Sequence, residues 1–268
     1  MATKKDLKRR VGFVQFAPKM LDVDGNVQKA LSLASKVDAD LLVLPELFSS
    51  GYAFQSRNDL AQVAEEVPEG PTTKELLDFS REKRNCVVAG IAEREGSRFY
   101  NSAVAVYKGK LLGVYRKTHL FGAIEKAVFS PGDSGFKVFD AGGMNVGVMV
   151  CFDWFFPESM RTLALMGADV VAHPANLVLP FCPDALKTRC MENRVYAAMA
   201  DIVGEQRGLQ FQGLSEVVAP DGSVIFRAGA NKAEAKAVEI DLSLARSKKL
   251  KSGNDLFEER RPEFYRLR

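Results

Sequence analysis

Apolar residues recur along the chain with two different periods, and together these periods predict a protein of mixed strands and helices. Apolar runs at 11–16, 41–44, 87–91, 146–150 and 169–172 are typical of buried strands. Apolar residues at helical spacing predict helices over 26–37, 72–85, 157–166 and 185–200. Turn-forming glycines separate paired runs and predict two hairpins, at 102–115 and 135–150. Further short strands are expected near 202–203, 214–218, 224–225 and 237–240.

The order of these elements predicts a layered α/β fold. Residues 11–44 follow the order strand, helix, strand, and later strands alternate with helices and hairpins. We see no linker, internal repeat or low-complexity segment in the pattern. We therefore expect one domain over residues 1–268, with two sheets sandwiched between helices.

Charge and composition exclude several classes of function. The chain has 37 Lys and Arg residues against 34 Asp and Glu, a net charge of +3, and the basic residues form no stripe, which argues against a nucleic-acid partner. The basic opening at 4–10 precedes an apolar run too short for a signal peptide. Because no run reaches the roughly 18–20 apolar residues of a membrane span, we expect no membrane partner and a cytoplasmic location.

The cysteines and histidines give no sign of a metal site or a disulfide framework. Cys86, Cys151, Cys182 and Cys190 form no CxxC pair, so we expect free thiols. His119 and His173 are the only histidines, and neither has the spacing to cysteine that zinc sites show. His173 is either a satisfied core residue or part of a pocket mouth. The sequence thus predicts neither a metal nor an organic cofactor.

Three reactive side chains follow three apolar strands. Glu46 comes after 41–44, Lys117 after 111–115 and Cys151 after 146–150. Because functional sites in α/β folds collect at strand ends, a carboxylate, an amine and a thiol are candidates for one pocket. Cys151 on its own could equally be a packed core thiol, Glu46 a helix-capping group and Lys117 a solvated charge.

These three groups together could cleave a C–N bond. A thiol is a weak nucleophile until it loses its proton, and a nearby carboxylate can act as the general base. When the sulfur attacks an amide or nitrile carbon, negative charge develops on oxygen or nitrogen. An ammonium group and a backbone N–H can hold that charge, and losing one such donor typically costs ~2.7–4 kcal/mol.

The same residues lie in sequence blocks that resemble those of the nitrilase, or carbon-nitrogen hydrolase, superfamily. The blocks are Leu44-Pro45-Glu46-Leu47-Phe48, Tyr115-Arg116-Lys117-Thr118-His119-Leu120-Phe121 and Val150-Cys151-Phe152-Asp153-Trp154-Phe155-Phe156-Pro157-Glu158. Their order agrees with the family, and smaller matches extend from Gln15 to Tyr265. One departure is Asp201, where many members have Asn, and we interpret it as structural.

The resemblance implies both a fold and a set of roles. The fold would be a four-layer α-β-β-α sandwich that pairs with a second subunit, as a homodimer or a higher even oligomer. Glu46 would be the general base, Lys117 the oxyanion stabiliser and Cys151 the nucleophile. Glu125 would orient the lysine, although an ion pair at the surface is the alternative, and the N–H of Phe152 would be a second oxyanion donor. Pairing would use helices 157–166 and 185–200, with the tail 257–268 wrapped onto the partner.

The substrate is less well determined than the chemistry. Residues 151–154 read Cys-Phe-Asp-Trp rather than the Cys-Trp-Glu common in nitrilases, which is more similar to the short amidase, carbamoylase and archaeal nitrilase-like branch. The expected pocket is walled by aromatic side chains, with Asn176 as a polar contact; the aromatic candidates are Phe48, Tyr52, Phe121, Phe152, Trp154 and Phe156. We expect a small amide as substrate, a small aliphatic nitrile as the second candidate, and a catalytically silent binding module as the alternative class.

Overall fold

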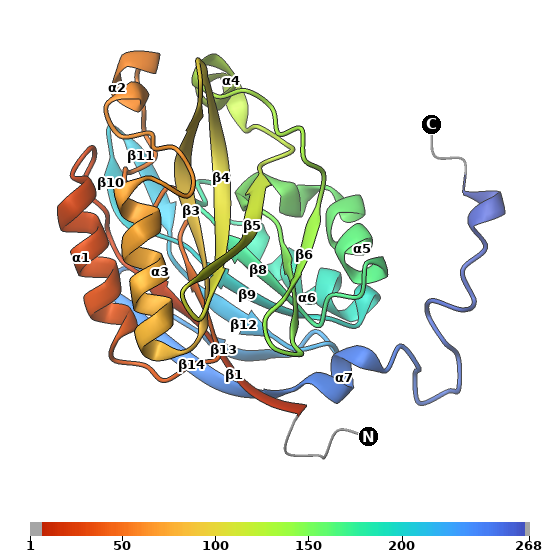
Figure 1. Cartoon of the computed structure of the whole chain (residues 1–268). Coiled ribbons are helices and arrows are strands. Elements are labelled where there is room, and N and C mark those ends of the chain that lie inside the picture. The colour runs from red at the N-terminus through yellow and green to blue at the C-terminus, as the bar shows by residue number, and fades with distance from the viewer. Residues whose placement is uncertain (1–6, 266–268) are drawn as a thin grey trace.

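Two six-stranded sheets pack face to face, and helices cover their outer faces (Figure 1). The structure is a computed structural model and describes residues 7–265 of the 268-residue chain. This arrangement of helix layer, sheet, sheet and helix layer confirms the predicted layered α/β class.

Strands and helices alternate in parts of the chain, while β3 to β5 and β9 to β14 follow one another without a helix between them. The strands are β1 (Lys8–Gln15), β2 (Leu41–Leu44), β3 (Cys86–Glu95), β4 (Arg98–Tyr107), β5 (Lys110–Arg116), β6 (Lys137–Asp140), β7 (Asn145–Val148), β8 (Val170–Pro174), β9 (Tyr196–Ala200), β10 (Val203–Gln206), β11 (Leu209–Gln212), β12 (Glu216–Val218), β13 (Val224–Arg227) and β14 (Glu234–Asp241). The helices are α1 (Val23–Ala34), α2 (Arg57–Ala61), α3 (Pro71–Lys83), α4 (Gly122–Val128), α5 (Pro157–Leu165), α6 (Cys182–Asn193) and α7 (Leu242–Arg246), with 3-10 turns η2 (Cys151–Phe155) and η3 (Pro262–Phe264).

Each large sheet has parallel strands at its centre. The first sheet has the order β14-β1-β2-β3-β4-β5, in which β1, β2 and β3 are parallel. The second has the order β13-β12-β9-β8-β7-β6, in which β7, β8 and β9 are parallel. Within each sheet the parallel strands end at the same edge, and β2 packs against β8 of the second sheet, so the loops that follow β2 and β7 can supply one site.

The core has two layers of apolar packing. Between the sheets, Val11 and Phe13 of β1 belong to the same buried cluster as Val146 and Val148 of β7. On the outer face of the first sheet, α1 and α3 bury Ala30 and Leu76 against it. Helices α5 and α6 cover the second sheet (Figure 1).

The structure corrects the sequence prediction of one long helix over 185–200. Helix α6 ends at Asn193, because Arg194 adopts a left-handed conformation (φ 50°, ψ 53°). Residues Tyr196–Ala200 then form β9, a buried strand parallel to β8. Its alanines and methionine suit a helix by propensity, but burial on both faces in the middle of a sheet overrides that preference.

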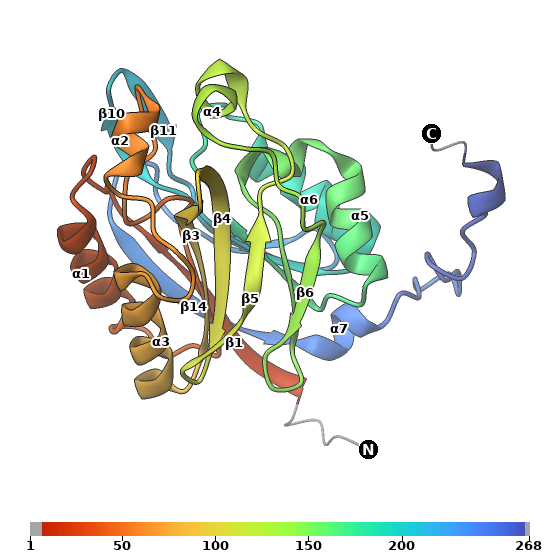
Figure 2. The same cartoon turned by 45° about the horizontal axis from the view of Figure 1, so that its top comes forward.

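The sequence pattern did not predict the short helices α2, α4 and α7. Helices α2 and α4 and the β10–β11 hairpin gather at one end of the sheets (Figure 2).

The tail after α7 extends away from the body (Figure 1). Its predicted contact with a partner stays a prediction, and residues 266–268, like the basic residues 4–6, lie outside the described part. Over residues 7–265 every helix is too short or too polar to cross a membrane.

Candidate active site

The segments that follow β2, β5 and β7 bring the three predicted groups to one place. Asn176 connects two of these segments. Its side-chain Nδ2 donates to the backbone carbonyl of Glu46 at 2.8 Å, and its backbone carbonyl oxygen lies 3.6 Å from the Cys151 sulfur. Glu46 and Lys117 are joined directly, with Nζ 2.7 Å from Oε1. Carboxylate, amine and thiol therefore share one buried region.

Glu46 is held by a tight bend against β3. Phe48 N–H donates to the Gly90 carbonyl at 3.0 Å, and Gly90 N–H donates to the Pro45 carbonyl at 3.1 Å. A side chain at position 90 would place its Cβ only 2.4 Å from the Cα of Glu46. Only glycine at this position lets the two backbones approach so closely.

Lys117 lies between two carboxylates, all of them buried. Its Nζ donates to Glu46 Oε1 at 2.7 Å and to the two oxygens of Glu125 at 2.8 and 2.9 Å. The side chains of Lys117 and Glu46 are 0% exposed and that of Glu125 is 2% exposed. The lysine is thus fixed in position by an ion cluster away from solvent, which excludes the alternatives of a solvated Lys117 and a surface Glu125.

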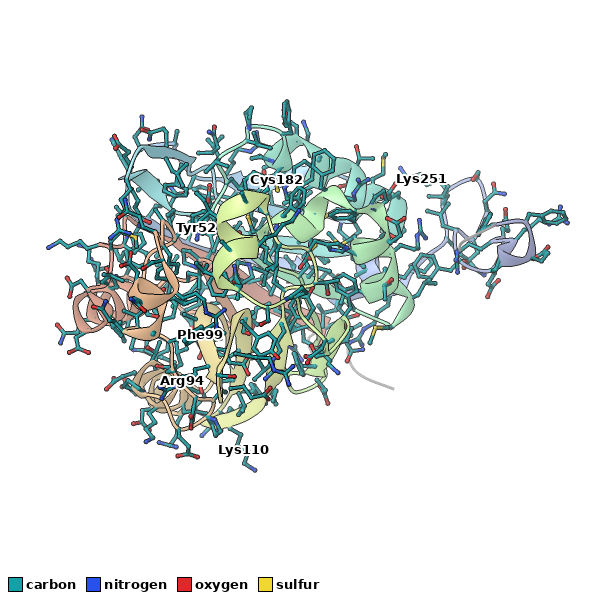
Figure 3. The ribbon with its side chains drawn as sticks, turned by 90° about the horizontal axis from the view of Figure 1, so that it is seen from above. Tyr52, Arg94, Phe99, Lys110, Cys182 and Lys251 are labelled. Carbon is teal, nitrogen blue, oxygen red and sulfur yellow. The ribbon has the colours of Figure 1, made fainter. Side chains whose placement is uncertain are left out.

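Two further side chains complete this cluster. Tyr52, which was expected only as an aromatic wall, donates its hydroxyl to Glu125 Oε1 at 2.7 Å and lies beside α4 in the view from above (Figure 3). Asn101, which matched the family but received no role from the sequence, donates Nδ2 to Glu46 Oε1 at 2.6 Å. Among residues 7–265, nothing bonds to Oε2 of Glu46.

Burial dominates the titration of the cluster. It raises the pKa of Glu46 to about 7, against the opposing effect of Lys117 and with a further rise from Glu125. Burial disfavours the charge on Lys117, but the carboxylates of Glu125 and Glu46 outweigh it and hold the pKa of the lysine well above its usual value. Burial and Glu46 also raise the pKa of the Cys151 thiol well above its usual range. The resting thiol is therefore neutral and needs a base before it can attack.

Cys151 stands at the start of the 3-10 turn η2 in a strained conformation, with φ at 42°. Hydrogen bonds hold the backbone on both sides of it. Asp153 Oδ2 accepts the Val150 N–H at 2.9 Å, and Nε2 of His173 lies 3.0 Å from the Cys151 carbonyl oxygen. Asp153 is itself fixed by the hydroxyl of Tyr115 and the ring of His119, each at 2.7 Å.

A small apolar cleft opens beside the cysteine. Its lining residues are Phe121, Cys151, Phe152, Trp154, Asn176, Leu177, Val178 and Leu179. A second hollow next to it shares Phe121 and Val178 and adds Tyr52. No charged side chain lines either hollow among the described residues.

The structure places some of the predicted aromatic residues at this cleft and others away from it. Phe121, Phe152 and Trp154 line the cleft, as does Asn176. Phe48 does not, because it is completely buried in the core between the first sheet and its helices. Phe156 stacks on the His119 ring, with 3.7 Å between ring centroids, and makes an edge contact with Phe152.

Asp201, the departure from the family pattern, has a structural position. It is fully buried, and Oδ1 accepts the N–H groups of Leu177 and Ile202 at 2.8 and 2.9 Å. Burial raises its pKa well above the usual value despite these bonds. Through its bond to the Leu177 N–H, Asp201 holds a residue that lines the cleft.

Comparison with known proteins agrees with this geometry. Residues 10–250 match the family model described as carbon-nitrogen hydrolase. The chain is 51% identical to a nitrilase of Pyrococcus abyssi over 96% of this chain and 98% of the relative. It is 38% identical to an (R)-stereoselective amidase of a Pseudomonas species, over 87% and 85% of the two chains.

A solved amidase from a Nesterenkonia species has the same fold. Its acrylamide complex superposes with a TM-score of 0.83 at 27% identity, over 98% of both chains. Other structures of that amidase hold butyramide, or the acetamide moiety of fluoroacetamide added covalently to the active-site cysteine. Given the match over most of its length, this chain belongs to the carbon-nitrogen hydrolase family of the nitrilase superfamily and is an enzyme of the nitrilase or amidase type.

Proposed function

We propose that this protein hydrolyses small uncharged amides to a carboxylic acid and ammonia, through a thioester on Cys151. The observation that carries the proposal is the buried Glu46 carboxylate. Its pKa is raised to about 7, and its Oε2 has no partner among residues 7–265. A carboxylate with a free oxygen and a pKa near neutrality is suited to take a proton and return it.

In the first half-reaction, Glu46 takes the thiol proton while the sulfur of Cys151 bonds to the amide carbon. The electron pair of the C=O bond moves to the oxygen, which becomes an oxyanion. Lys117 Nζ and the Phe152 N–H would donate to that oxygen, and Lys117 is already fixed for this role by its ion pairs. The intermediate collapses when the C–N bond breaks, and the proton from Glu46 leaves with ammonia.

In the second half-reaction, water replaces ammonia. Glu46 takes a proton from water as the water oxygen bonds to the thioester carbon, and the same two donors hold the oxyanion. The C–S bond then breaks, the proton returns to the sulfur, and the acid leaves. Glu125 would keep Lys117 charged and oriented throughout, since both of its oxygens accept from Nζ.

The cleft favours a small and uncharged acyl group. Apart from Cys151 and Asn176, its lining is aromatic or aliphatic. A substrate with its own carboxylate would need a cation to replace lost hydration, and the described lining contains no charged side chain. The acrylamide and butyramide held by the Nesterenkonia amidase are of this size and class.

A small aliphatic nitrile is the second candidate substrate. The observation that favours it is the name nitrilase on the relative that is 51% identical over nearly the whole chain. Attack on a nitrile carbon would place the charge on nitrogen, and the same two donors could hold it. Addition of water to the thioimidate and loss of ammonia would then lead to the same thioester.

We also propose that two copies pair through α5, α6 and the turn before α5. Phe155, Leu165, Met166 and Met191 lie in or next to these elements and are 45–51% exposed in the single chain, so they offer apolar surface that a second copy could cover. Sedimentation should show a dimer or a higher even oligomer, and a stable monomer would contradict the pairing. All four cysteines are free thiols, which supports the cytoplasmic location that we expect.

The test is ammonia release from a panel of small amides and nitriles, scored for free acid. Wild type should be active, and Cys151→Ala should abolish release while leaving the melting curve nearly unchanged. Cys86→Ala, at another buried free thiol, is the matched control and should remain active. Ammonia release by Cys151→Ala would contradict the proposed mechanism. A wild type that releases no ammonia from any compound would favour a binding module.

A further inference from the structure

His173 is a buried group that the reaction above does not use. It lies in β8 and is 0% exposed. Its Nε2 is 3.0 Å from the carbonyl oxygen of Cys151, and its Nδ1 has no partner among the described residues. The ring thus makes its hydrogen bond to the backbone of the nucleophile.

The partner of the ring determines where its proton lies. A carbonyl oxygen can only accept, so Nε2 must carry the hydrogen. Burial lowers the pKa of His173 to about 4, so the ring is neutral at ordinary pH, with its lone pair on Nδ1. His173 is therefore a fixed donor to Cys151 and is not a base for the thiol.

We propose that His173 is a positioning residue for the oxyanion hole, and that it acts by fixing the peptide between Cys151 and Phe152. This inference rests on the proposed function, in which the N–H of that peptide is one of the two oxyanion donors. A peptide unit is planar and trans, so its C=O and N–H point in opposite directions. Holding the carbonyl oxygen of Cys151 on one side therefore aims the N–H of Phe152 on the other.

The backbone at this point needs such a restraint. Cys151 has φ at 42°, a left-handed conformation that a residue with a side chain keeps only when its surroundings enforce it. The N–H of Asp153 donates to the Val150 carbonyl at 3.1 Å and so holds the peptide before Cys151, but that bond leaves rotation of the peptide after Cys151 free. The bond from His173 restrains this second rotation. It also polarises the peptide, which strengthens the N–H as a donor.

Two variants of similar size separate the hydrogen bond from the bulk of the ring. His173→Gln can place an amide N–H near the position of Nε2, and its oxygen would replace Nδ1 as the unpartnered acceptor. His173→Leu fills the space without a donor. We expect Leu to lower kcat by roughly tenfold or more, below the ~10²–10³-fold that losing an oxyanion donor outright costs, while KM changes little. Gln should restore most of the lost kcat.

Alkylation of Cys151 by iodoacetamide distinguishes a role in the oxyanion hole from a general structural role. Damage to the structure around the cysteine would slow alkylation, whereas loss of the oxyanion hole alone would not. This reaction displaces iodide from a saturated carbon, so no oxyanion forms and the hole is not needed. The alkylation rate and melting temperature of His173→Leu should match those of wild type while its kcat falls. If alkylation falls in parallel with kcat, or if kcat stays at the wild-type level, the inference is wrong.

If His173→Leu does not fold, His173→Asn against His173→Gln gives the same test. Both are amides, but the shorter Asn cannot reach the Cys151 carbonyl, so kcat should be low in Asn and recover in Gln. Equal kcat values in the two variants would overturn the inference. An active wild type with an unaffected His173→Leu overturns the inference alone, whereas a wild type that releases no ammonia overturns it together with the proposed function.

Discussion

Two neighbouring cations at the end of β5, Arg116 and Lys117, organise two ion clusters of opposite character. Arg116 lies near the surface, with its side chain 15% exposed. It binds the buried Glu93 and the exposed Glu95 and Asp133, and its guanidinium lies 3.9 Å from the centre of the Tyr100 ring. Lys117 points into the molecule and binds Glu46 and Glu125. Both clusters consist of one cation among carboxylates, and they differ chiefly in access to water.

Water changes what the carboxylates can do. Hydrogen bonds from Arg116 hold the pKa values of Glu95 and Asp133 below their usual range, so these groups stay ionised and inert. Burial raises the pKa of Glu46 to about 7 although an ammonium lies 2.7 Å away. The same pairing of charges thus gives a stable surface network in one place and a group ready to exchange protons in the other.

Replacing the two cations should produce the largest contrast. Lys117→Met leaves two buried carboxylates without their partner, which should lower the free energy of unfolding by about 3–5 kcal/mol. It also removes one oxyanion donor, so kcat should fall by about 10²–10³-fold. The matched change Arg116→Met should cost less stability, because water can solvate Glu95 and Asp133 and the Ser102 hydroxyl still donates to the buried Glu93. It should leave kcat near wild type. Chemical denaturation and ammonia release measure both effects, and equal losses in the two variants would contradict the comparison.

Neutralising one carboxylate in each cluster tests the difference with less structural damage. Glu46→Gln keeps the shape and a hydrogen bond to Asn101 but removes the base, so kcat should fall by roughly 10²–10⁴-fold. Glu95→Gln is the control on the exposed side and should keep wild-type activity. The comparison would be wrong if the two variants lost activity to the same extent in the ammonia assay.

The smallest expected effect is the position of the acidic limb of the pH profile. Glu46 acts as a base only when ionised, and its pKa is about 7. kcat/KM should therefore rise with pH through about 7 and fall about tenfold per pH unit below that. Glu125→Gln removes a negative charge that raises the pKa of Glu46, so its limb should move to lower pH. A limb that stays in place would show that Glu46 is not the titrating group.

The sequence identifies strands well where an apolar run is unbroken, and poorly where the residues also suit a helix. Residues 41–44 and 146–150 are apolar without a break, and this pattern has few interpretations other than a buried strand. The segment at 196–200 is also apolar, but its alanines are compatible with a helix, so only its place inside the sheet decides the outcome. Prediction from the local sequence pattern fails where contacts with distant parts of the chain determine the secondary structure.

The same limit applies to the site. The positions of Glu46, Lys117 and Cys151 after strands were readable, and their family blocks indicated their roles. Phe48 and Tyr52 come soon after Glu46 and are both aromatic, yet Phe48 packs into the core and Tyr52 binds Glu125. Which way a side chain points after a tight bend depends on backbone geometry that residue type does not report.

The close approach of β3 to the Glu46 bend has a consequence for how this enzyme can vary. Position 90 touches no substrate, yet a single added methyl group there would collide with the backbone that carries the base. Substitutions at this position should therefore reduce activity as severely as substitutions of the reacting groups themselves. A survey of tolerated mutations should therefore reveal part of the active site in the middle of a strand, at a residue with no chemistry of its own.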